Sequence, residues 1–459
     1  MGQTRKLFGT DGLRGRANVH PMTGEVMLEL GRALASVFRL GPGSERRHRV
    51  LIGKDTRRSG YMLEDALAAG LCSMGVEVLQ VGPIPTPGLA FLTVDMRCDA
   101  GAMISASHNS FEDNGVKFFS RDGFKLPDDL EARIEALMYT PELARDRPVA
   151  EAVGSARRID DALGRYIVFL KKTFPRELTL EGLRVAIDCA HGAAYKVGPT
   201  VLEELGAEVI AVGARPDGTN INASCGALHP EHVARIVREY RADVGVALDG
   251  DADRCILVDE LGQIVDGDRV LAMCALDRQR SGQLARNAVV GTVMTNLGVE
   301  RALHAQGVKM LRAEVGDRYV VELMRREKLS VGGEQSGHLV FLDHNTTGDG
   351  IQTALQVLAL MRRRDRALSE CANVYEPLPQ VLRAVRVRDK PPLDSLPSVQ
   401  QVIERVEGKL GGAGRLLVRY SGTEPVARVM LEGEDRTLIE QLAQEVCAEI
   451  RSVLGGEGG

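Results

Sequence analysis

The sequence predicts an α/β protein of three related α/β domains with mixed, largely parallel sheets, followed by a smaller C-terminal α+β domain. Two observations predict this class. Short apolar runs of strand length alternate with amphipathic stretches of helical length, and the alternation restarts twice along the chain. The chain also has 459 residues, which is enough for roughly three or four domains.

The predicted elements follow one another in three blocks. In the first block we expect a strand, an amphipathic helix and two further strands, over residues 49–53, 60–75, 76–82 and 100–107. In the second block strands and helices alternate over residues 183–188, 197–206, 207–213, 231–241 and 243–250. In the third block they alternate over residues 287–295, 298–307, 308–314, 317–328 and 329–334. Strands separated by helices favour largely parallel sheets.

The C-terminal part has a different pattern. Strands are expected over 383–389, 415–422 and 426–433, the last two as a hairpin, and helices over 398–410 and 439–455. Two prolines near residues 373–380 indicate a linker before this part. The predicted domain boundaries are 1–157, 158–258, 259–370 and 371–459.

Composition excludes several classes of protein. The net charge of −5 argues against a general nucleic-acid or membrane binder, so a phosphate-binding surface must be local. No apolar run approaches the ~20 residues of a membrane helix. The eight cysteines are scattered without a CxxC pair, which indicates buried thiols in a reducing compartment. We therefore expect a cytoplasmic protein.

The stretch MISASHNS at residues 103–110 ends a predicted strand in polar side chains. Ligands of open α/β sheets sit beyond the carboxyl ends of strands, so Ser107 is well placed for chemistry. A turn or capping role is the alternative, since Ser and Asn favour such positions. Adjacency of Ser107 and His108 does not make them a catalytic pair, because neighbouring side chains of an extended backbone point to opposite faces.

Three carboxylates at alternate positions, Asp249, Asp251 and Asp253, follow the apolar run DVGVAL. Such carboxylates repel one another unless a cation joins them, so the pattern indicates a metal site. The absence of His or thiolate from the set favours a hard ion, and a phosphate partner favours Mg²⁺. A solvated acidic surface loop is the alternative.

A calcium loop of the EF-hand type is a second alternative for this segment, because Glu260 falls at its twelfth position. Its sixth position requires a glycine for the sharp turn, and Arg254 stands there. The preceding residues predict a strand, and residues 255–268 predict a hairpin. We therefore reject the calcium loop.

Three further segments combine glycine with polar groups. RYSGTEP at 419–425, with Arg428 beyond it, offers arginines, hydroxyls and exposed backbone N–H to a phosphate, or forms a plain hairpin turn. GGEQSGH at 332–338 lets Glu334 and Ser336 approach a polyhydroxyl ligand, or simply ends a strand. GTDGLRG at 9–15 is weak by itself.

Together these segments resemble the motifs of the α-D-phosphohexomutases. That family has a TASHNP or SASHNP serine loop, a DGDxDR metal loop, a GGExSGH sugar loop and an RxSGTEP phosphate loop. This sequence has SASHNS, DGDADR, GGEQSGH and RYSGTEP, in the same order over nearly the whole chain. Ser110 stands where the family usually has proline, and we expect a small effect of this difference.

The resemblance implies four domains around a central cleft and assigns roles to matching residues. Ser107 would be the phosphoserine, and Mg²⁺ would be held by Ser107, Asp249, Asp251 and Asp253. Lys117 in NGVKFF would be the acid/base, assisted by Arg14, and His108 of the serine loop completes the candidate catalytic set. A lysine with a reference pKa of roughly 10 needs a cationic neighbour or burial to act as a base. The implied substrate-binding residues are Arg254, Glu334, Ser336, Arg419, Ser421, Gly422, Thr423 and Arg428.

FGTDGLRG and the EQ of GGEQSGH bring the resemblance closest to the glucosamine-phosphate branch of the family. It implies interconversion of glucosamine 6-phosphate and glucosamine 1-phosphate through a phosphoserine and a hexosamine 1,6-bisphosphate, on the route to UDP-N-acetylglucosamine. The alternatives are the same chemistry on glucose or mannose phosphates, and a non-catalytic phosphosugar-binding protein. We expect neither nucleic acid nor membrane as a partner, and a homodimer is a state that the sequence leaves open.

Overall fold

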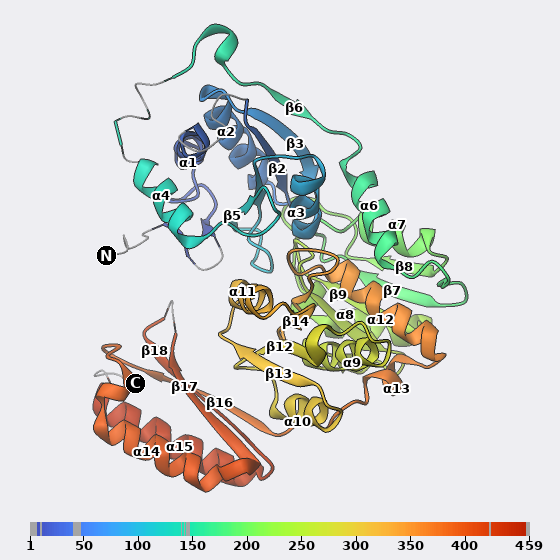
Figure 1. Cartoon of the computed structure of the whole chain (residues 1–459), viewed down its shortest axis with the longest axis vertical. Coiled ribbons are helices and arrows are strands. Elements are labelled where there is room, and N and C mark those ends of the chain that lie inside the picture. Colours follow the sequence, from blue (N-terminus) through green and yellow to red (C-terminus); the bar gives the residue numbers. More distant parts are fainter. Residues whose placement is uncertain are drawn as a thin grey trace. The chain divides into compact units, whose positions relative to one another are not determined.

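The computed structural model divides the chain into two compact units. The first comprises Met1–Thr292 and Leu311–Asn373, and the second comprises Val293–Met310 and Val374–Gly459. Figure 1 shows the order of their elements along the chain. The structure describes residues 7–9, 12–39, 47–138, 140–141, 143, 147–421 and 424–455.

The first unit begins with a six-stranded sheet of mixed direction. Its strands lie in the order β1 (Leu13–Arg16), β5 (Asp113–Ser120), β4 (Ala100–Ile104), β2 (Arg49–Lys54), β3 (Glu77–Pro83) and β6 (Ala156–Arg158). The helices of this part are α1 (Gly24–Arg39), α2 (Ser59–Ser73), α3 (Thr86–Asp95), α4 (Asp128–Met138) and the 3₁₀ turn η1 (Ala150–Ala152). Strand β2 runs parallel to β3 and β4, whereas β5 runs antiparallel to both β4 and β1.

The central strand β2 is apolar on both faces of this sheet, and helices cover both faces. Val50 and Ile52 of β2 enter the core that also contains the apolar residues of α1 and α2. Leu51, between them, enters a separate core with Leu89 of α3. Successive side chains of a strand point to opposite faces, so a continuous apolar run of this kind marks a strand that is buried on both sides.

A second sheet of five strands follows in the same unit. Its strands lie in the order β11 (Ile264–Val265), β10 (Cys255–Asp259), β9 (Val244–Leu248), β7 (Arg184–Asp188) and β8 (Glu208–Val212). Its helical elements are α6 (Ala162–Thr173), α7 (Val197–Glu204), η2 (Gly226–Leu228) and α8 (Pro230–Tyr240). Strands β7, β8 and β9 are parallel, and the predicted hairpin is β10–β11.

A third sheet has four strands. They lie in the order β13 (Lys309–Ala313), β12 (Ala288–Thr292), β14 (Val331–Gly333) and β15 (Leu339–Phe341). The surrounding helices are α9 (Gly267–Arg280), η3 (Ala285–Asn287), α11 (Asp317–Glu327), α12 (Gly350–Arg364) and α13 (Leu368–Ala372). Asp349 caps α12 by accepting a hydrogen bond from the backbone N of Gln352 at 3.0 Å.

The second unit contains a three-stranded antiparallel sheet. Its strands lie in the order β16 (Gln380–Arg386), β18 (Val426–Gly433) and β17 (Gly414–Tyr420). The helical elements are α10 (Leu297–Ala305), η4 (Leu393–Ser395), α14 (Pro397–Leu410), η5 (Gly411–Ala413) and α15 (Arg436–Leu454). Helices α14 and α15 lie side by side on the sheet (Figure 1), and their apolar residues share its core.

The predicted fold class is confirmed: three α/β parts with mixed sheets precede a smaller α+β part. Strands β1 and β5 were not predicted from the sequence, and β5 matters because it carries Lys117. The boundaries 1–157, 158–258, 259–370 and 371–459 stay predictions. Among the helices of the described residues, none has both the length and the apolar character that crossing a bilayer requires.

Candidate active site

The serine loop follows β4 directly, and Ser107 is buried within it. Ser107 has a positive φ of 52°, in the left-handed region that side chains of L-residues seldom adopt. Its hydroxyl donates a hydrogen bond to Asp249 Oδ2 at 2.6 Å, although the two residues are far apart in the sequence. The candidate phosphoserine and the first predicted metal ligand therefore meet in one site.

His108 also lies against this hydroxyl, which the sequence argument did not expect. Its Nδ1 is 3.2 Å from Ser107 Oγ. The expectation of opposite faces assumed an extended backbone, and the left-handed turn at Ser107 removes that assumption. Burial, with the charges of Arg254 and Arg14, lowers the pKa of His108 to about 4. The ring is therefore neutral near pH 7 while Ser107 carries no phosphate.

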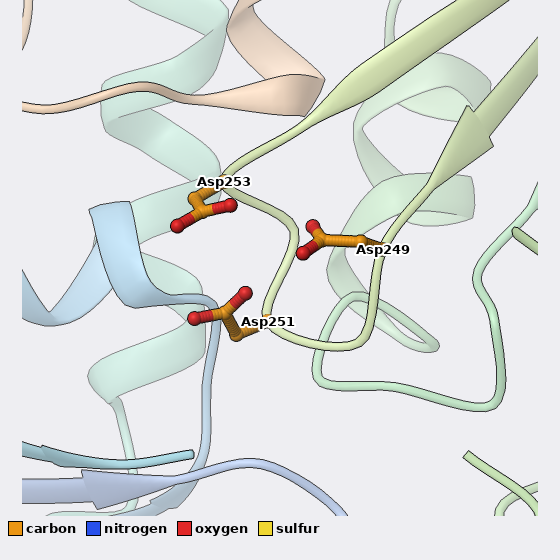
Figure 2. A group of neighbouring side chains, drawn as sticks. All are labelled: Asp249, Asp251 and Asp253. Carbon is orange, nitrogen blue, oxygen red and sulfur yellow. The ribbon is translucent and has the colours of Figure 1, made fainter. Parts of the chain in front are cut away.

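The three aspartates lie on the loop that joins β9 to β10, and their carboxylates converge (Figure 2). One carboxylate oxygen from each lies within 4.8 Å of the others, and all three residues are buried. Burial, with the charges of Asp253 and Asp251, raises the pKa of Asp249 well above its usual range. Burial acts in the same direction on Asp253, but Lys117 and His338 hold its pKa well below the usual range.

Two oxygens of this cluster fit a metal ion. Asp251 Oδ1 and Asp253 Oδ1 are buried and have no hydrogen-bond partner within 3.5 Å, and His338 Nδ1 lies 3.7 Å from Asp253 Oδ1. Buried carboxylate oxygens are costly without a partner, and a bound cation would supply one. The donors are all carboxylate oxygens, which is the ligand type of a hard divalent ion. The buried, Asp-rich cluster is thus a candidate metal site.

The calcium-loop alternative does not fit the geometry. An EF-hand places its loop between two helices, whereas this loop joins the antiparallel strands β9 and β10. Glu260, which would be the twelfth ligand, instead accepts hydrogen bonds from the backbone N and the hydroxyl of Ser369. The rejection of the calcium loop is consistent with both observations.

Lys117 reaches the acidic cluster from β5. Its Nζ donates to Asp251 Oδ2 at 3.1 Å and to Asp253 Oδ2 at 3.5 Å, and its side chain is buried. Arg14 lies on the neighbouring strand β1, where it pairs with Gly115 of β5. Lys117, the predicted acid/base, and Arg14, predicted to assist it, therefore come from adjacent strands at the edge of the first sheet.

The segment GGEQSGH forms the tight turn between β14 and β15. Gly337 has a φ of 89°, and a Cβ there would lie 2.3 Å from the carbonyl oxygen of Cys255. The Cys255 backbone N donates to the carbonyl of Gly337 at 3.0 Å, so this turn is anchored to the end of the aspartate loop. Glu334 Oε1 accepts from the backbone N of Gly316 at 2.9 Å, while Ser336 is exposed.

His338 of the same turn joins the site, although it was not among the predicted site residues. Its Nδ1 is 3.7 Å from Asp253 Oδ1 and its Nε2 is 3.7 Å from Asp317 Oδ2. Burial opposes protonation, but Asp253, Asp317 and Glu334 raise the pKa of His338 overall. Arg254 is also held here, since its backbone N donates to Asp249 Oδ1 at 3.1 Å and its Nε is 3.9 Å from Asp253 Oδ1.

The predicted phosphate loop lies in the second unit, at the β17–β18 hairpin. Arg419 and Arg428 face each other across the two strands. Burial and the charge of Arg428 lower the pKa of Arg419, which marks two cations close together. Arg428 also pairs with Glu424 at 2.7 Å, and Ser421 Oγ accepts from the backbone N of Glu424 at 3.3 Å.

Beside this hairpin is a cavity of about 320 Å³, and both arginines line it. Two facing cations favour an anionic ligand. The other two predicted residues of the loop, Gly422 and Thr423, lie outside the described residues.

Four residues that contact the serine and aspartate loops were missed by the sequence reasoning. Thr86 Oγ1 donates to Asp251 Oδ2 at 2.6 Å. Asp55, Arg57 and Asn222 surround the serine loop. One signal was available: Asp55 and Arg57 directly follow the buried strand β2, at the same edge of the sheet as Ser107.

Family models for phosphoglucomutase/phosphomannomutase match nearly the whole chain. The α/β/α domain I model matches residues 5–145, the domain II model matches 164–262 and the domain III model matches 266–378. The C-terminal domain model matches residues 382–449.

Curated relatives are similar over their full length. The chain is 58% identical to the phosphoglucosamine mutase of Geotalea uraniireducens, over 98% of this chain and 99% of the relative. It is also 58% identical to those of Geobacter metallireducens, over 99% and 100% of the two chains, and of Myxococcus xanthus, over 98% of each.

Solved structures share the fold at lower identity. A phosphoglucomutase/phosphomannomutase family protein from Burkholderia thailandensis superposes with a TM-score of 0.79 at 22% identity, covering 97% of both chains. An N-acetylphosphoglucosamine mutase from Aspergillus fumigatus, in complex with GlcNAc-6P and magnesium, has a TM-score of 0.65 at 18% identity, covering 98% of this chain and 96% of that chain. At these identities the likeness bears on the fold alone.

The matching family models and the relatives show that the chain is an isomerase, an intramolecular phosphotransferase. The chain belongs to the phosphoglucomutase/phosphomannomutase family, the α-D-phosphohexomutases.

Proposed function

We propose that this enzyme interconverts glucosamine 6-phosphate and glucosamine 1-phosphate, with Ser107 as the phosphoryl carrier. The observation that carries the proposal is the hydrogen bond of 2.6 Å between the Ser107 hydroxyl and Asp249 of the buried acidic cluster. The curated relatives named phosphoglucosamine mutase, at 58% identity over nearly the full chain, support the choice of sugar.

The phosphoryl group moves in two steps. In the first, a free sugar hydroxyl attacks the phosphorus of phosphorylated Ser107, the bond from phosphorus to Ser107 Oγ breaks, and the oxygen leaves with its electron pair. The hydroxyl proton passes to a base, for which Lys117 is the candidate. In the second, the other phosphoryl group of the resulting 1,6-bisphosphate returns to Ser107 Oγ, and the sugar oxygen that it leaves regains a proton.

We assign Mg²⁺ to the acidic cluster, with Asp249, Asp251 and Asp253 as its protein ligands and the phosphate on Ser107 as a further one. When bound, the ion would neutralise the negative charge that develops on the phosphoryl oxygens during transfer. The two carboxylate oxygens without hydrogen-bond partners support this assignment. Lys117 Nζ lies 3.1 Å from Asp251 and 3.5 Å from Asp253, which places the candidate base beside the same phosphate position.

The intermediate carries two phosphates, so the enzyme needs a second anion position. We assign it to the cationic hairpin, with Arg419, Arg428 and Ser421 from the described residues and with Gly422 and Thr423 of the same motif. Glu334 and Ser336, on the turn beside the aspartate loop, would hold sugar hydroxyls in both orientations of the intermediate. Arg254 would contact the phosphate near the metal.

A mutase assay tests the proposal. Purified protein with Mg²⁺ and a catalytic amount of hexose 1,6-bisphosphate should convert glucosamine 6-phosphate to glucosamine 1-phosphate. Rates on glucose and mannose phosphates, measured side by side, separate this enzyme from a phosphoglucomutase or phosphomannomutase. Binding of all three without turnover, even after priming with bisphosphate, would instead support a phosphosugar-binding protein.

A further inference from the structure

The left-handed backbone at Ser107 is held from both sides of the residue. On its N-terminal side, the Ser107 backbone N donates to Ser105 Oγ at 2.9 Å. Ser105 Oγ in turn donates to Asp55 Oδ2 at 2.5 Å. An L-residue seldom adopts this conformation without such support.

On the C-terminal side, two side chains share the same pair of carbonyl groups. Arg57 Nη2 donates to the carbonyl oxygens of Ser107 and Asn109, at 3.1 and 2.6 Å. Asn222 Nδ2 donates to the same two oxygens, at 2.8 and 2.9 Å. These four hydrogen bonds join the serine loop to one residue that follows β2 and to one residue from a loop of the second sheet.

Both donors are themselves held in place. Arg57 is fully buried, and its Nη1 and backbone N both donate to Asp55. Asn222 has a φ of 58°, and its backbone N donates to the carbonyl of Ala190 at 2.9 Å. The guanidinium and the amide are therefore presented to the two carbonyls from fixed backbones.

The aspartate loop closes over this arrangement. A Cβ on Gly250 would lie 2.6 Å from the Ser107 carbonyl oxygen and 2.8 Å from Asn222 Nδ2. Only a glycine lets the backbone between Asp249 and Asp251 approach the clamped carbonyl so closely. The contact links the direction of the Ser107 hydroxyl to the position of the acidic cluster.

We propose that Arg57 and Asn222 are positioning residues that clamp the carbonyls of Ser107 and Asn109, so that Ser107 Oγ points at the acidic cluster for in-line transfer. The proposal rests on the function proposed above. Arg57 is paired with Asp55, so its charge is already balanced. Neither residue needs to touch substrate, because each acts through the backbone of Ser107.

Asn222→Ala tests the clamp, and Asn220→Ala is the matched control. Asn220 belongs to the same loop, but its amide donates to Arg215 within that loop and not to the serine loop. We expect Asn222→Ala to lower kcat by roughly ten- to a hundred-fold, because a misplacement of about 1 Å can cost 10²-fold. KM for the phosphosugar should change little, and the control should keep both constants.

A double-mutant cycle on Arg57 and Asn222 distinguishes positioning of Ser107 from a purely structural role, because it measures how the two substitutions combine in their effect on kcat. Arg57→Lys keeps the charge but loses the planar fork. Arg58→Lys is its control, since the backbone N of Arg58 donates to the carbonyl of Gly218 and a lysine keeps that hydrogen bond. Arg57 and Asn222 share both acceptors, so their effects on kcat should be strongly non-additive. The non-additivity should remain when each kcat is expressed per folded chain.

The outcomes distinguish a failure of the proposed clamp, formed by Arg57 and Asn222, from a failure of the proposed mutase function. If wild-type protein turns over the phosphosugar and Asn222→Ala keeps its kcat, the clamp is wrong. It is equally wrong if kcat falls only in proportion to the folded fraction, measured by circular dichroism. If Asn222→Ala does not fold, Arg57→Lys carries the same comparison. A wild-type protein without turnover would contradict the proposed function instead.

Discussion

The hydroxyl of Ser107 lies where a phosphate would be repelled unless cations were present. Asp249 accepts its hydrogen bond, and Asp251 and Asp253 complete a buried acidic cluster beside it. A phosphoserine adds about −1.5 to −2 charge to this cluster. Phosphorylation of Ser107 should therefore raise the affinity of the cluster for a divalent ion, and the bound ion should in turn stabilise the phosphoserine.

Asp253→Asn tests the metal site at the level of one residue. Asp253 Oδ1 has no hydrogen-bond partner, so its replacement removes a candidate ligand oxygen. We expect Mg²⁺ affinity and turnover at limiting Mg²⁺ to fall by roughly ten-fold or more, since even changes to groups that only hydrogen-bond the metal ligands cost about 10- to 100-fold. Calorimetric titration with Mg²⁺ and initial rates measure the two effects.

Glu260→Gln is the control for this substitution. It removes a carboxylate from the same segment that contacts Ser369 rather than the cluster. Its Mg²⁺ affinity should stay that of the wild type. Full activity of Asp253→Asn in the presence of chelator would show that the aspartates hold no functional metal.

At the scale of elements, the site is assembled where three loops meet at the ends of strands. The serine loop after β4, the aspartate loop after β9 and the β14–β15 turn approach one another through backbone contacts that tolerate only glycine at certain positions. Gly250 and Gly337 are two such positions, because a Cβ at either would lie 2.6 Å or less from a backbone oxygen.

Gly250→Ala should separate the aspartate loop from the serine loop. Its Cβ would overlap the Ser107 carbonyl, so we expect a loss of about 1–3 kcal/mol in the free energy of unfolding together with a clear fall in kcat. Urea unfolding and initial rates measure both. Gly164→Ala, in α6 with no atom within 4 Å of the new Cβ, should instead gain about 0.5–1 kcal/mol. Unchanged kinetics of Gly250→Ala would mean that the two loops need not touch.

The start of α12 gives the folded protein a pH dependence that can be measured. Burial raises the pKa of Asp349 to about 6, against hydrogen bonds from Gln352, Tyr166 and Asn345 that lower it. Between the unfolded value near 3.8 and about 6, the folded state binds more protons, so this group costs stability progressively as pH rises.

Asp349→Asn keeps a capping side chain and removes the charge. The stability of the wild type relative to this variant should fall by about 1 kcal/mol between pH 5 and pH 7, as the shift in pKa requires. Urea unfolding of both proteins at the two pH values measures the difference. A difference that is independent of pH, or one that grows in favour of the wild type, would contradict the raised pKa.

At the scale of the whole molecule, much of the fold was predictable because each strand–helix pair is encoded locally. The apolar runs at residues 49–53 and 243–250 lie on β2 and β9, which are covered by helices. The antiparallel strand β5 was not predicted, since DNGVKFFS mixes polar and apolar residues without a regular alternation. Helix α10 groups with the second unit, which no local pattern indicates.

The site was predictable to the extent that its chemistry lies in contiguous motifs. Three aspartates within five residues indicate a metal site from the sequence alone. The structure places them beside Ser107 and Lys117. Arg57 and Asn222 were missed because each contacts Ser107 across a long stretch of chain and carries no motif of its own. The left-handed turn at Ser107 was missed because serine gives no local signal for it.

Arg428→Ala tests the role of the second unit. If the cationic hairpin holds the phosphate that is not being transferred, removing one of its two arginines should raise KM, lower kcat and increase release of the bisphosphate into solution. Phosphoserine content should stay unchanged, because that phosphate belongs to the other unit. Arg436→Ala, an exposed arginine paired with Glu440, is the control and should leave all three unchanged. Loss of phosphoserine in Arg428→Ala would mean that the two phosphate positions are assigned the wrong way round.

The location of the transferred phosphoryl group shows directly whether Ser107 is the phosphoryl carrier. Protein cleared of phosphate should be incubated with a hexose 1,6-bisphosphate labelled in its phosphoryl groups, and then digested and mapped by mass spectrometry. We expect one labelled phosphoryl group per chain, on Ser107, which glucosamine 6-phosphate then removes as labelled bisphosphate. Ser107→Ala should take up no label and show no mutase activity while remaining folded, whereas Ser110→Ala should behave as the wild type. Label on another residue, or turnover by Ser107→Ala, would contradict the account.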